Sequence, residues 1–307
     1  MPIKKHLWSV LYGFLLAAFT VYVLLDTFVI TRVYITAPFN DGNSISVTTD
    51  AGGNAATKPE DSPVILTDTS YSDGNISITI SEHRKNETTI YVADVRLSSA
   101  DHLKTAFAQN AYGKNVTAKT SKIAEENNAI LAINGDYYGA QETGYVLRNG
   151  VLYRDAPKED REDLVIYRDG SFEIISEETT AADFLQKNGA YQVFSFGPAL
   201  VADGEISVTK DQEVGKAMAS NPRTAIGTID DLHYVFVVSD GRTDDSEGLS
   251  LYELAEFMQS LGVKTAYNLD GGGSSTMVFN GEVINNPTTS GKKVKERSVS
   301  DIVYIGY

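Results

Sequence analysis

The longest apolar stretch of the chain lies near its N-terminus, at residues 7–35. Lys4 and Lys5 precede this stretch, and Asp26 interrupts it. A helix needs about 20 apolar residues to span a bilayer, and the part before Asp26 comes close to that length. The positive-inside rule keeps the lysines cytoplasmic. We therefore predict a cytoplasmic basic flank at 1–6 and a transmembrane anchor at 7–35, with the rest of the chain extracytoplasmic.

A cleaved signal peptide is the alternative to an anchor. Its apolar region is shorter and ends in a small-residue site, and Val33-Tyr34-Ile35 does not provide one. The next residues, 36–63, contain turn-forming Asp, Asn and Gly residues, three prolines and few large apolar side chains. Such a segment buries too little apolar surface to offset the entropy of ordering. We predict a flexible stalk that carries a folded domain at 64–307.

Within 64–307 the hydrophobic pattern changes repeatedly between strand and helix periods. Alternation at 76–80 and a β-branched run at 90–97 predict two strands, joined as a hairpin by the polar residues 82–87. Asn-Gly or Asp-Gly pairs between apolar runs predict further hairpins, and these pairs lie at 149–150, 169–170, 203–204 and 280–281. Short apolar runs predict additional strands at 129–133, 265–269, 276–279 and 299–305.

Helix patterns occur at 99–109, 119–128 and 250–262. In the last of these, Ser250 and Glu253 form a capping box, the apolar residues share one face, and a glycine ends the helix. The whole predicts an α+β domain with a mixed sheet, antiparallel hairpins and a few packed helices, preceded by one N-terminal transmembrane helix.

Composition narrows the classes of function. The 307 residues include 26 Lys and Arg against 41 Asp and Glu, a formal net charge of −15. A nucleic-acid-binding protein needs a basic footprint, so nucleic acid is excluded as a partner. The absence of cysteine excludes disulfides, thiolate metal sites and a cysteine nucleophile. An anionic substrate would have to be held by a few local cations.

Polar residues that could bind a ligand or take part in catalysis gather at the ends of four strand-like runs. They lie in Asn134–Gly139, Asn221–Gly227, Ser239–Arg242 and Asn268–Thr276. Polar groups at the ends of buried strands form rigid sites in many proteins. We therefore expect these four segments to meet.

The fourth segment contains three consecutive glycines, which let the backbone approach a ligand and present N–H groups to an anion. The hydroxyl groups that follow add donors. The candidate ligand-binding residues of this loop are Gly271, Gly272, Gly273, Ser274, Ser275 and Thr276. The loop matches neither the Walker nor the dinucleotide pattern. A plain turn is the alternative interpretation.

Two arginines and three aspartates complete the candidate chemistry. Arg223 and Arg242 offer planar guanidinium groups that suit phosphate oxygens, although each could instead form a surface ion pair. Asp136, Asp240 and Asp270 are candidate acids and bases, because cleavage of a glycosidic bond uses carboxyl groups for proton transfer. They could also bind a hard cation such as calcium. No twelve-residue calcium loop is present, so we predict neither a metal nor another cofactor.

In this order the motifs resemble the phosphodiester glycosidase family. The matching stretches are Ala132–Tyr138, Ser195–Leu200, Asn221–Gly227, Asp240–Arg242 and Asn268–Thr276. The resemblance implies a mixed α/β domain with a cleft where these motifs gather. It also implies hydrolysis of a sugar–phosphodiester bond, with release of the sugar and a phosphomonoester. Animal members carry a disulfide-bearing tail, which a chain without cysteine cannot reproduce.

The resemblance also implies roles for individual residues. Asn134 and Asp136 would line the sugar-binding cleft, Arg223 and Arg242 would hold the phosphodiester, and Asp240 would orient or protonate it. Asp270 with Gly271–Thr276 would form the floor. We predict that Asp136, Asp240, Asp270 and Arg223 are catalytic, and that Asn134, Arg242 and 271–276 bind substrate.

The predicted protein is a membrane-anchored hydrolase that cleaves sugar-1-phosphodiester bonds in cell-envelope glycans or glycopolymers, at a bacterial surface. A non-catalytic glycan-binding module is one alternative. A metal-dependent phosphodiesterase with the three aspartates as ligands is another. The basic residues between Lys292 and Arg297 could reach a polyanion, but short charge runs are usually solvated loops, and we favour that interpretation here.

Overall fold

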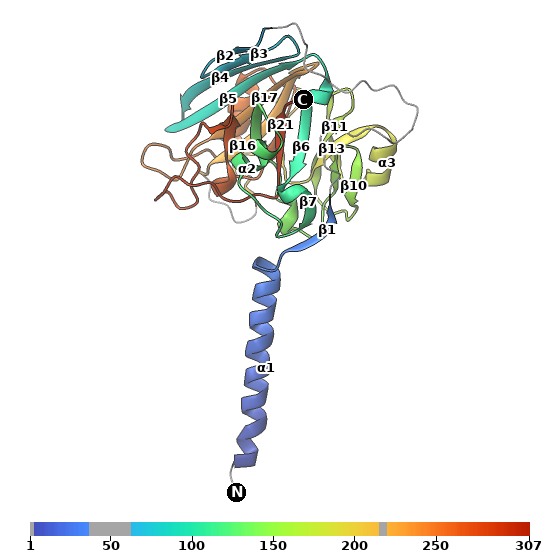
Figure 1. Cartoon of the computed structure of the whole chain (residues 1–307), viewed down its shortest axis with the longest axis vertical. Helices are drawn as coiled ribbons and strands as arrows, with labels where there is room; N and C mark the ends of the chain where they lie inside the picture. The colour runs from blue at the N-terminus through green and yellow to red at the C-terminus, as the bar shows by residue number, and fades with distance from the viewer. Residues whose placement is uncertain (1–2, 37–62, 215–219) are drawn as a thin grey trace.

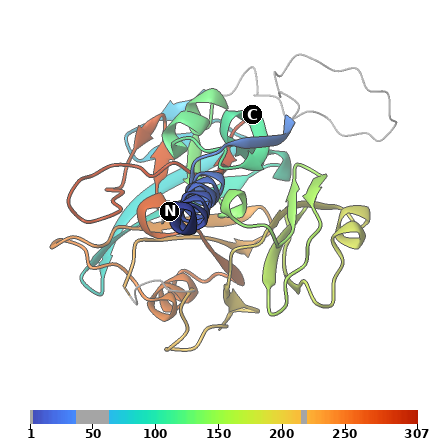
Figure 2. The same ribbon diagram turned by 90° about the horizontal axis from the view of Figure 1, so that it is seen from below.

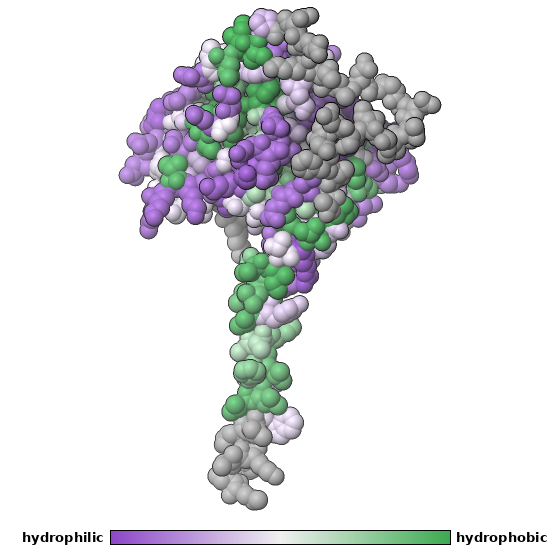
Figure 3. Space-filling model, in the orientation of Figure 1, coloured by the Kyte–Doolittle hydropathy of each residue, from purple (hydrophilic) through white to green (hydrophobic). Residues whose placement is uncertain are grey.

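The computed structural model describes residues 3–36, 63–214 and 220–307 (Figure 1). A single helix, α1 (Ile3–Phe28), projects from a compact body. Its segment Trp8–Phe28 has a mean hydropathy of 2.0 and is long and apolar enough to cross a membrane. None of that segment is buried against the body, and the exposed helix is mostly hydrophobic where the body is mostly hydrophilic (Figure 3).

The chain enters the body immediately after α1. Strand β1 (Arg32–Thr36) pairs antiparallel with β7 (Ala111–Lys114), so only residues 29–31 lie between helix and sheet. The side-chain amide of Asn115 donates to the backbone carbonyls of Thr27 and Ile30, at 3.3 and 3.0 Å. The structure therefore differs from the expected anchor at 7–35, because β-branched residues after residue 31 extend along a free strand edge.

The expected stalk at 36–63 lies outside the described residues except at its ends. Those ends belong to the body: β1 precedes the segment, and β2 (Ile65–Leu66) follows it in the largest sheet. The segment is therefore not the connection between α1 and the body. The sequence pattern gave no sign of this, because the pairing of β1 depends on a partner strand about 80 residues away.

Two antiparallel sheets packed face to face form the centre of the body. The nine-stranded sheet consists, in spatial order, of β15 (Glu205–Ile206), β14 (Ala199–Ala202), β18 (Thr265–Leu269), β16 (Arg223–Asp230), β17 (His233–Ser239), β5 (Thr88–Leu97), β4 (Ile76–Lys85), β3 (Ser70–Ser72) and β2. The five-stranded sheet consists of β20 (Glu282–Val283), β19 (Met277–Phe279), β8 (Leu131–Asn134), β21 (Asp301–Ile305) and β6 (Leu103–Phe107).

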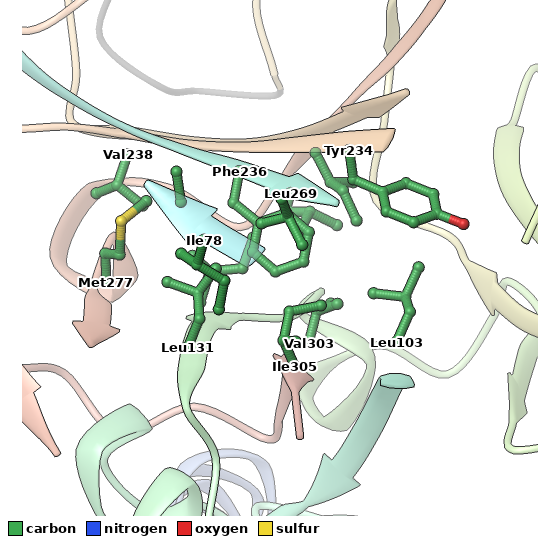
Figure 4. Close-up of a cluster of buried hydrophobic side chains, with 14 of the residues drawn as sticks. Ile78, Leu103, Leu131, Tyr234, Phe236, Val238, Leu269, Met277, Val303 and Ile305 are labelled. Atoms are coloured by element: carbon green, nitrogen blue, oxygen red, sulfur yellow. The ribbon is translucent and has the colours of Figure 1, made fainter. Parts of the chain in front are cut away.

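The main core fills the space between these sheets. Phe236 and Leu269 from the larger sheet lie over Leu131, Val303 and Ile305 from the smaller one (Figure 4). Alternate residues of the same strands face outward, as the period of a strand requires. They pack under α4 (Leu251–Ser260) on the larger sheet and under α2 (Thr120–Glu126) on the smaller sheet. The layers therefore run helix, sheet, sheet, helix.

A third sheet lies to one side of these layers (Figure 2). It contains β10 (Val151–Arg154), β9 (Val146–Arg148), β13 (Ala190–Phe194), β11 (Glu162–Tyr167) and β12 (Phe172–Ser176), with α3 (Ala182–Lys187) packed on it. Short 3₁₀ helices connect other elements at Ala100–His102, Ala108–Asn110, Tyr138–Ala140 and Gly272–Ser274.

Most local predictions are confirmed, including the α+β class. Each of the four Asn-Gly or Asp-Gly pairs joins two strands, with positive φ at Asn149, Asp203 and Asn280. The capping box of α4 is present. The predicted hairpin of 76–80 and 90–97 is longer than expected, because its strands extend to Lys85 and Thr88 and leave Asn86–Glu87 as the turn.

The helix predicted at 99–109 is wrong. After one 3₁₀ turn, this segment forms β6 and pairs with β21. The side chains of Leu103, Thr105 and Phe107 are buried and alternate with less buried ones, which is the period of a strand. Polar residues around this segment make the period hard to recognise in the sequence. The pairing with a strand almost 200 residues later decides the conformation.

Candidate active site

The four sequence segments meet at one end of the two central sheets. Strand β16 begins at Arg223, opposite the last residue of β17, Ser239. Its next residue, Thr224, lies opposite Leu269 at the end of β18. The loops before β16 and after β17 and β18 therefore leave from the same edge of the nine-stranded sheet.

Asn134, at the end of β8, ties the five-stranded sheet to that edge. Its side chain is fully buried and donates to the carbonyl oxygen of Asp270 at 2.6 Å. Its Oδ1 accepts from the Thr224 hydroxyl at 2.9 Å and from the Thr276 backbone N–H at 3.2 Å. These bonds place Asn134 beneath the glycine loop rather than on the surface of a cleft. These bonds link β8, β16 and the glycine loop.

Asp136 lies in a buried charge network beside the glycine loop. Its Oδ2 accepts from Arg148 Nη2 at 2.9 Å and from the Ser195 backbone N–H at 3.1 Å. The same guanidinium binds Asp301 through Nε and Nη2, at 3.0 and 2.9 Å. All three charged side chains are at most 1% exposed.

Burial raises the pKa of Asp301 to about 8, although the Arg148 guanidinium favours the ionised form. Its Oδ1 has no hydrogen-bond partner among the described residues. Sequence reasoning missed both Arg148 and Asp301. The sequence did contain a signal for both residues, because each is a charged residue next to an apolar, strand-like run. Arg148 follows Val146 and Leu147, and Asp301 precedes the apolar residues 302–305.

Arg223 is the most buried of the arginines at the glycine loop. It is 3% exposed, and its Nε donates to the Leu249 carbonyl oxygen at 2.8 Å. Its Nη2 forms an ion pair with Glu213, also at 2.8 Å. A Cβ atom on Gly271 would lie 3.9 Å from both Cα and Cδ of Arg223. This arginine therefore lies directly against the loop, with its charge matched by a carboxylate.

Arg242 approaches the same loop from the end of β17. Its guanidinium donates to Asn221 Oδ1 at 2.8 and 3.1 Å and to the Thr289 carbonyl oxygen at 2.6 Å. A Cβ atom on Gly272 would lie 2.9 Å from Arg242 Nη2, so the absence of a side chain there allows the close approach. Within the described ranges Arg242 forms no ion pair with a carboxylate. It is half-buried and keeps an uncompensated positive charge.

Arg297 is a third guanidinium that sequence reasoning did not assign to the site. Its Nη2 binds the Asp270 carboxylate at 3.1 and 3.3 Å and the Gly271 carbonyl oxygen at 3.0 Å, and its Nε donates to the Ser274 hydroxyl at 2.8 Å. Burial, followed by the charges of Arg297 and Arg223, lowers the pKa of Arg242. The guanidinium groups of Arg223 and Arg297 are therefore both close enough to Arg242 to repel it.

Asp270 is the predicted acid that contacts one of these cations, through its ion pair with Arg297 at 3.1 Å. Burial raises its pKa above the usual value, although the Arg297 guanidinium favours the ionised form. Its side chain retains 12% exposure, more than that of Asp136. Among the predicted acids, Asp270 thus combines contact with the loop and access from solvent.

The glycine loop itself differs from the expected anion cradle. The backbone N–H of Gly272 donates to the Pro222 carbonyl oxygen, and those of Ser274 and Ser275 donate within the loop. With the Thr276 N–H, which donates to Asn134, four N–H groups of Gly271–Thr276 are therefore used inside the protein. The hydroxyls of Ser275 and Thr276 are fully buried and have no partner among the described residues. Positive charge at this site comes from the arginines.

Asp240 is held by residues of the loop after β20. Its Oδ1 accepts from the Asn286 backbone N–H at 2.8 Å and from the Asn285 side chain at 3.2 Å, and its Oδ2 accepts from the Asn286 side chain. These bonds fix the loop after β20. Among the described residues no three His, Asp or Glu side chains form a group that could hold a metal ion.

Residues 127–306 match the family model of the phosphodiester glycosidases. This chain belongs to the phosphodiester glycosidase family. The match begins just before β8, covers every motif at the site and ends after β21. The family resemblance inferred from the sequence is confirmed.

Similar sequences occur in bacteria and animals. The SPbeta prophage-derived uncharacterized protein YomE of Bacillus subtilis (strain 168) is 31% identical over 190 residues, which are 60% of this chain and 29% of YomE. The human N-acetylglucosamine-1-phosphodiester alpha-N-acetylglucosaminidase is 31% identical over 163 residues, which are 52% of this chain and 27% of the human protein. The matched region is thus less than a third of the length of either relative.

The phosphodiester glycosidase fold extends beyond the region of the family model. The auto-inhibited catalytic domain of the zebrafish N-acetylglucosamine-1-phosphodiester alpha-N-acetylglucosaminidase superposes with a TM-score of 0.60 and 24% identity. The superposition covers 83% of this chain and 87% of the zebrafish chain. The similarity therefore includes the N-terminal strands of the body as well as the motif-bearing ones.

Proposed function

We propose that this chain hydrolyses sugar-1-phosphodiester bonds and releases the sugar and a phosphomonoester. The observation that carries the proposal is the guanidinium of Arg242, which faces the glycine loop without a carboxylate partner in the described part of the chain. On a chain of net charge −15, an uncompensated cation beside two further arginines favours binding of an anion. A phosphodiester is the anion that the family name specifies.

The arrangement suggests a division of roles. Arg242 binds the non-bridging phosphate oxygens, and Arg223 and Arg297, each paired with a carboxylate, hold the glycine loop beside it. The bond from the sugar C1 to the phosphate oxygen breaks, and a bond from a water oxygen to C1 forms. Asp270 transfers the proton of that water to the phosphomonoester product, a role that suits a carboxyl group with a raised pKa. Asp136 and Asp240 position the loops through their internal bonds.

We place the reaction outside the cytoplasmic membrane, on glycans or glycopolymers of the cell envelope. The support is the apolar helix Trp8–Phe28 and the two lysines before it, which favour a cytoplasmic N-terminus. Membrane extraction of the expressed full chain tests the anchor. A retained anchor predicts that the chain stays in the membrane fraction after a carbonate wash. Release of a shortened chain into the medium would favour a cleaved signal sequence.

The activity is tested with the full chain in a neutral detergent. N-acetylglucosamine-1-phosphate esterified to methanol, and UDP-N-acetylglucosamine, serve as substrates, and released sugar is measured. Arg242→Gln should lower kcat/KM by about 10²–10³-fold, the usual cost of removing one preorganised charge donor. Arg96→Gln, on an exposed residue of β5, is the matched control and should be as active as the wild type.

Two outcomes would overturn the proposal. One is the absence of sugar release from either substrate or from the corresponding hexose phosphodiesters, together with tight binding of the glycan, which would favour a binding module. The other is Arg242→Gln activity equal to that of the wild type. The same assay in a chelator addresses the metal-dependent alternative, which requires activity to disappear. The proposal expects activity to be retained, because all three aspartates already bind protein groups.

A further inference from the structure

A strongly basic segment adjoins the candidate site. Residues 289–298 connect β20 to β21 and lie against the glycine loop. The Arg297 backbone N–H donates to the Gly273 carbonyl oxygen at 3.1 Å, and a Cβ atom on Gly273 would lie 2.3 Å from the Thr289 hydroxyl. We call residues 289–298 the basic segment.

The charges of the basic segment are not neutralised locally. Lys292, Lys293 and Lys295 are exposed and form no ion pair within the described ranges. The acidic residue among them, Glu296, is directed elsewhere: its carboxylate accepts from the Ser121 N–H and hydroxyl at 2.9 and 2.6 Å. Three positive charges within four residues repel one another, and bound anions would reduce this repulsion. They stand out in a chain with 15 more acidic than basic residues.

The same segment borders an open hollow that could receive those anions. This open cavity has a volume of about 540 Å³, and residues of the basic segment line it, including the three lysines and Arg297. That volume is in the range of small-molecule sites. Arg297 joins the cavity to the site, because its guanidinium binds Asp270 and the Ser274 hydroxyl. A substrate whose phosphodiester lies at Arg242 can therefore extend into the cavity.

We infer that the basic segment is a subsite for a second phosphate group, carried by the leaving part of the substrate. This inference rests on the proposed function and narrows its substrate class to sugar-1-phosphodiesters whose leaving group is itself anionic. A nucleoside diphosphate and a phosphate-bridged polymer share this chemistry. Lysine suits the role because its compact ammonium group binds phosphate as a point charge and adapts to several positions.

The test uses the full chain in neutral detergent and a triple variant, Lys292→Gln/Lys293→Gln/Lys295→Gln. The methyl phosphodiester of N-acetylglucosamine-1-phosphate has a neutral leaving alcohol. UDP-N-acetylglucosamine and a glycosyl phosphate linked to oligo(glycerol phosphate) carry further phosphates. We expect kcat/KM to fall at least tenfold for the two polyanionic substrates and to change less than twofold for the methyl ester. The size of the loss on each polyanionic substrate distinguishes nucleotide from polymer.

The matched control is Lys122→Gln/Lys187→Gln/Lys264→Gln, which removes the same charge from exposed lysines that pair with carboxylates elsewhere. It should behave as the wild type on all substrates. Higher salt should reduce the wild-type preference for polyanionic substrates and leave that of the triple variant unchanged.

An equal loss on neutral and anionic substrates, or no loss on any of them, would overturn the inference while leaving the proposed function intact. Should no substrate be turned over, binding of tripolyphosphate is measured by titration calorimetry. At least tenfold weaker binding to the basic-segment variant than to the control variant would support the subsite, and equal binding would refute it.

Discussion

Removal of Arg148 should destabilise the protein strongly. The Arg148 side chain is 1% exposed and lies 2.9 Å from carboxylate oxygens of both Asp136 and Asp301. In Arg148→Met these two carboxylates stay buried without their counter-ion. Loss of one partner from a buried charge network costs about 3–5 kcal/mol. A domain of this size loses about 2–4 °C of Tm per kcal/mol, so we expect Tm to fall by roughly 6–20 °C at pH 8.

The effect should depend on pH in a defined direction. Without the guanidinium, the folded state protonates both carboxyl groups at a higher pH than the unfolded chain, whose aspartates have a pKa of about 3.9. The folded variant therefore gains stability as pH falls towards that value. Thermal unfolding of the full chain in detergent, followed by circular dichroism, should show a smaller deficit at pH 5 than at pH 8.

Two further variants make the result interpretable. Arg96→Met removes an exposed arginine that lies 3.8 Å from Asp94, and its Tm should stay within about 2 °C of the wild type. Adding Asp136→Asn and Asp301→Asn to Arg148→Met removes the two buried unpaired charges and should recover part of the lost Tm. A Tm deficit below about 3 °C for Arg148→Met at pH 8, or one that is no smaller at pH 5, would refute the reasoning.

Two other predictions follow from the site. The pKa of Asp301 is raised from 3.8 to about 8, so its contribution to stability is fully present below pH 3.8 and is lost as pH rises through about 8. Asp301→Asn should therefore have a Tm that varies less than the wild-type Tm between pH 4 and pH 8, and an equally steep profile would contradict this. Gly272→Ala would place a methyl group 2.9 Å from Arg242 Nη2, at a φ of +62°. We expect it to lower glycosidase turnover at least tenfold, whereas Gly262→Ala, with a φ of +80° and open space around its Cβ, has similar backbone strain and should keep normal turnover.

Local chemistry made parts of the fold predictable from sequence. The pair Asn149-Gly150 adopts positive φ at both residues, which is the property that makes such pairs hairpin turns. Ser250 caps α4 through bonds to Glu253, three residues along the chain. In contrast, residues 103–107 became a strand through pairing with β21, which no local pattern encodes.

The same distinction applies to the candidate site. Strand-end motifs predicted that Arg242 and the glycine loop would meet. They do so because β17 and β18 both pair antiparallel with β16 and therefore end at the same edge of the sheet. The link between Arg148 and Asp301 spans 153 positions and was not visible in the sequence. Arg297 was recognised as part of a basic run, but its bond to Asp270 depends on how the chain returns from β20 to β21. Side-chain partnerships across sheets are set by tertiary packing.

The pairing of β1 with β7 restricts how far the folded body can travel from a lipid surface. Residues 29–31 extend at most about 10 Å. The Asn115 side-chain amide also binds the carbonyl oxygens of Thr27, in the last turn of α1, and of Ile30. The Asn115 N–H also bonds to the Gly139 carbonyl oxygen, in the loop that follows Asp136. With α1 as the anchor that we propose, hydrolysis would be confined to phosphates displayed close to the outer leaflet. Lipid-linked chains would then be within reach, and polymers at the cell periphery would not.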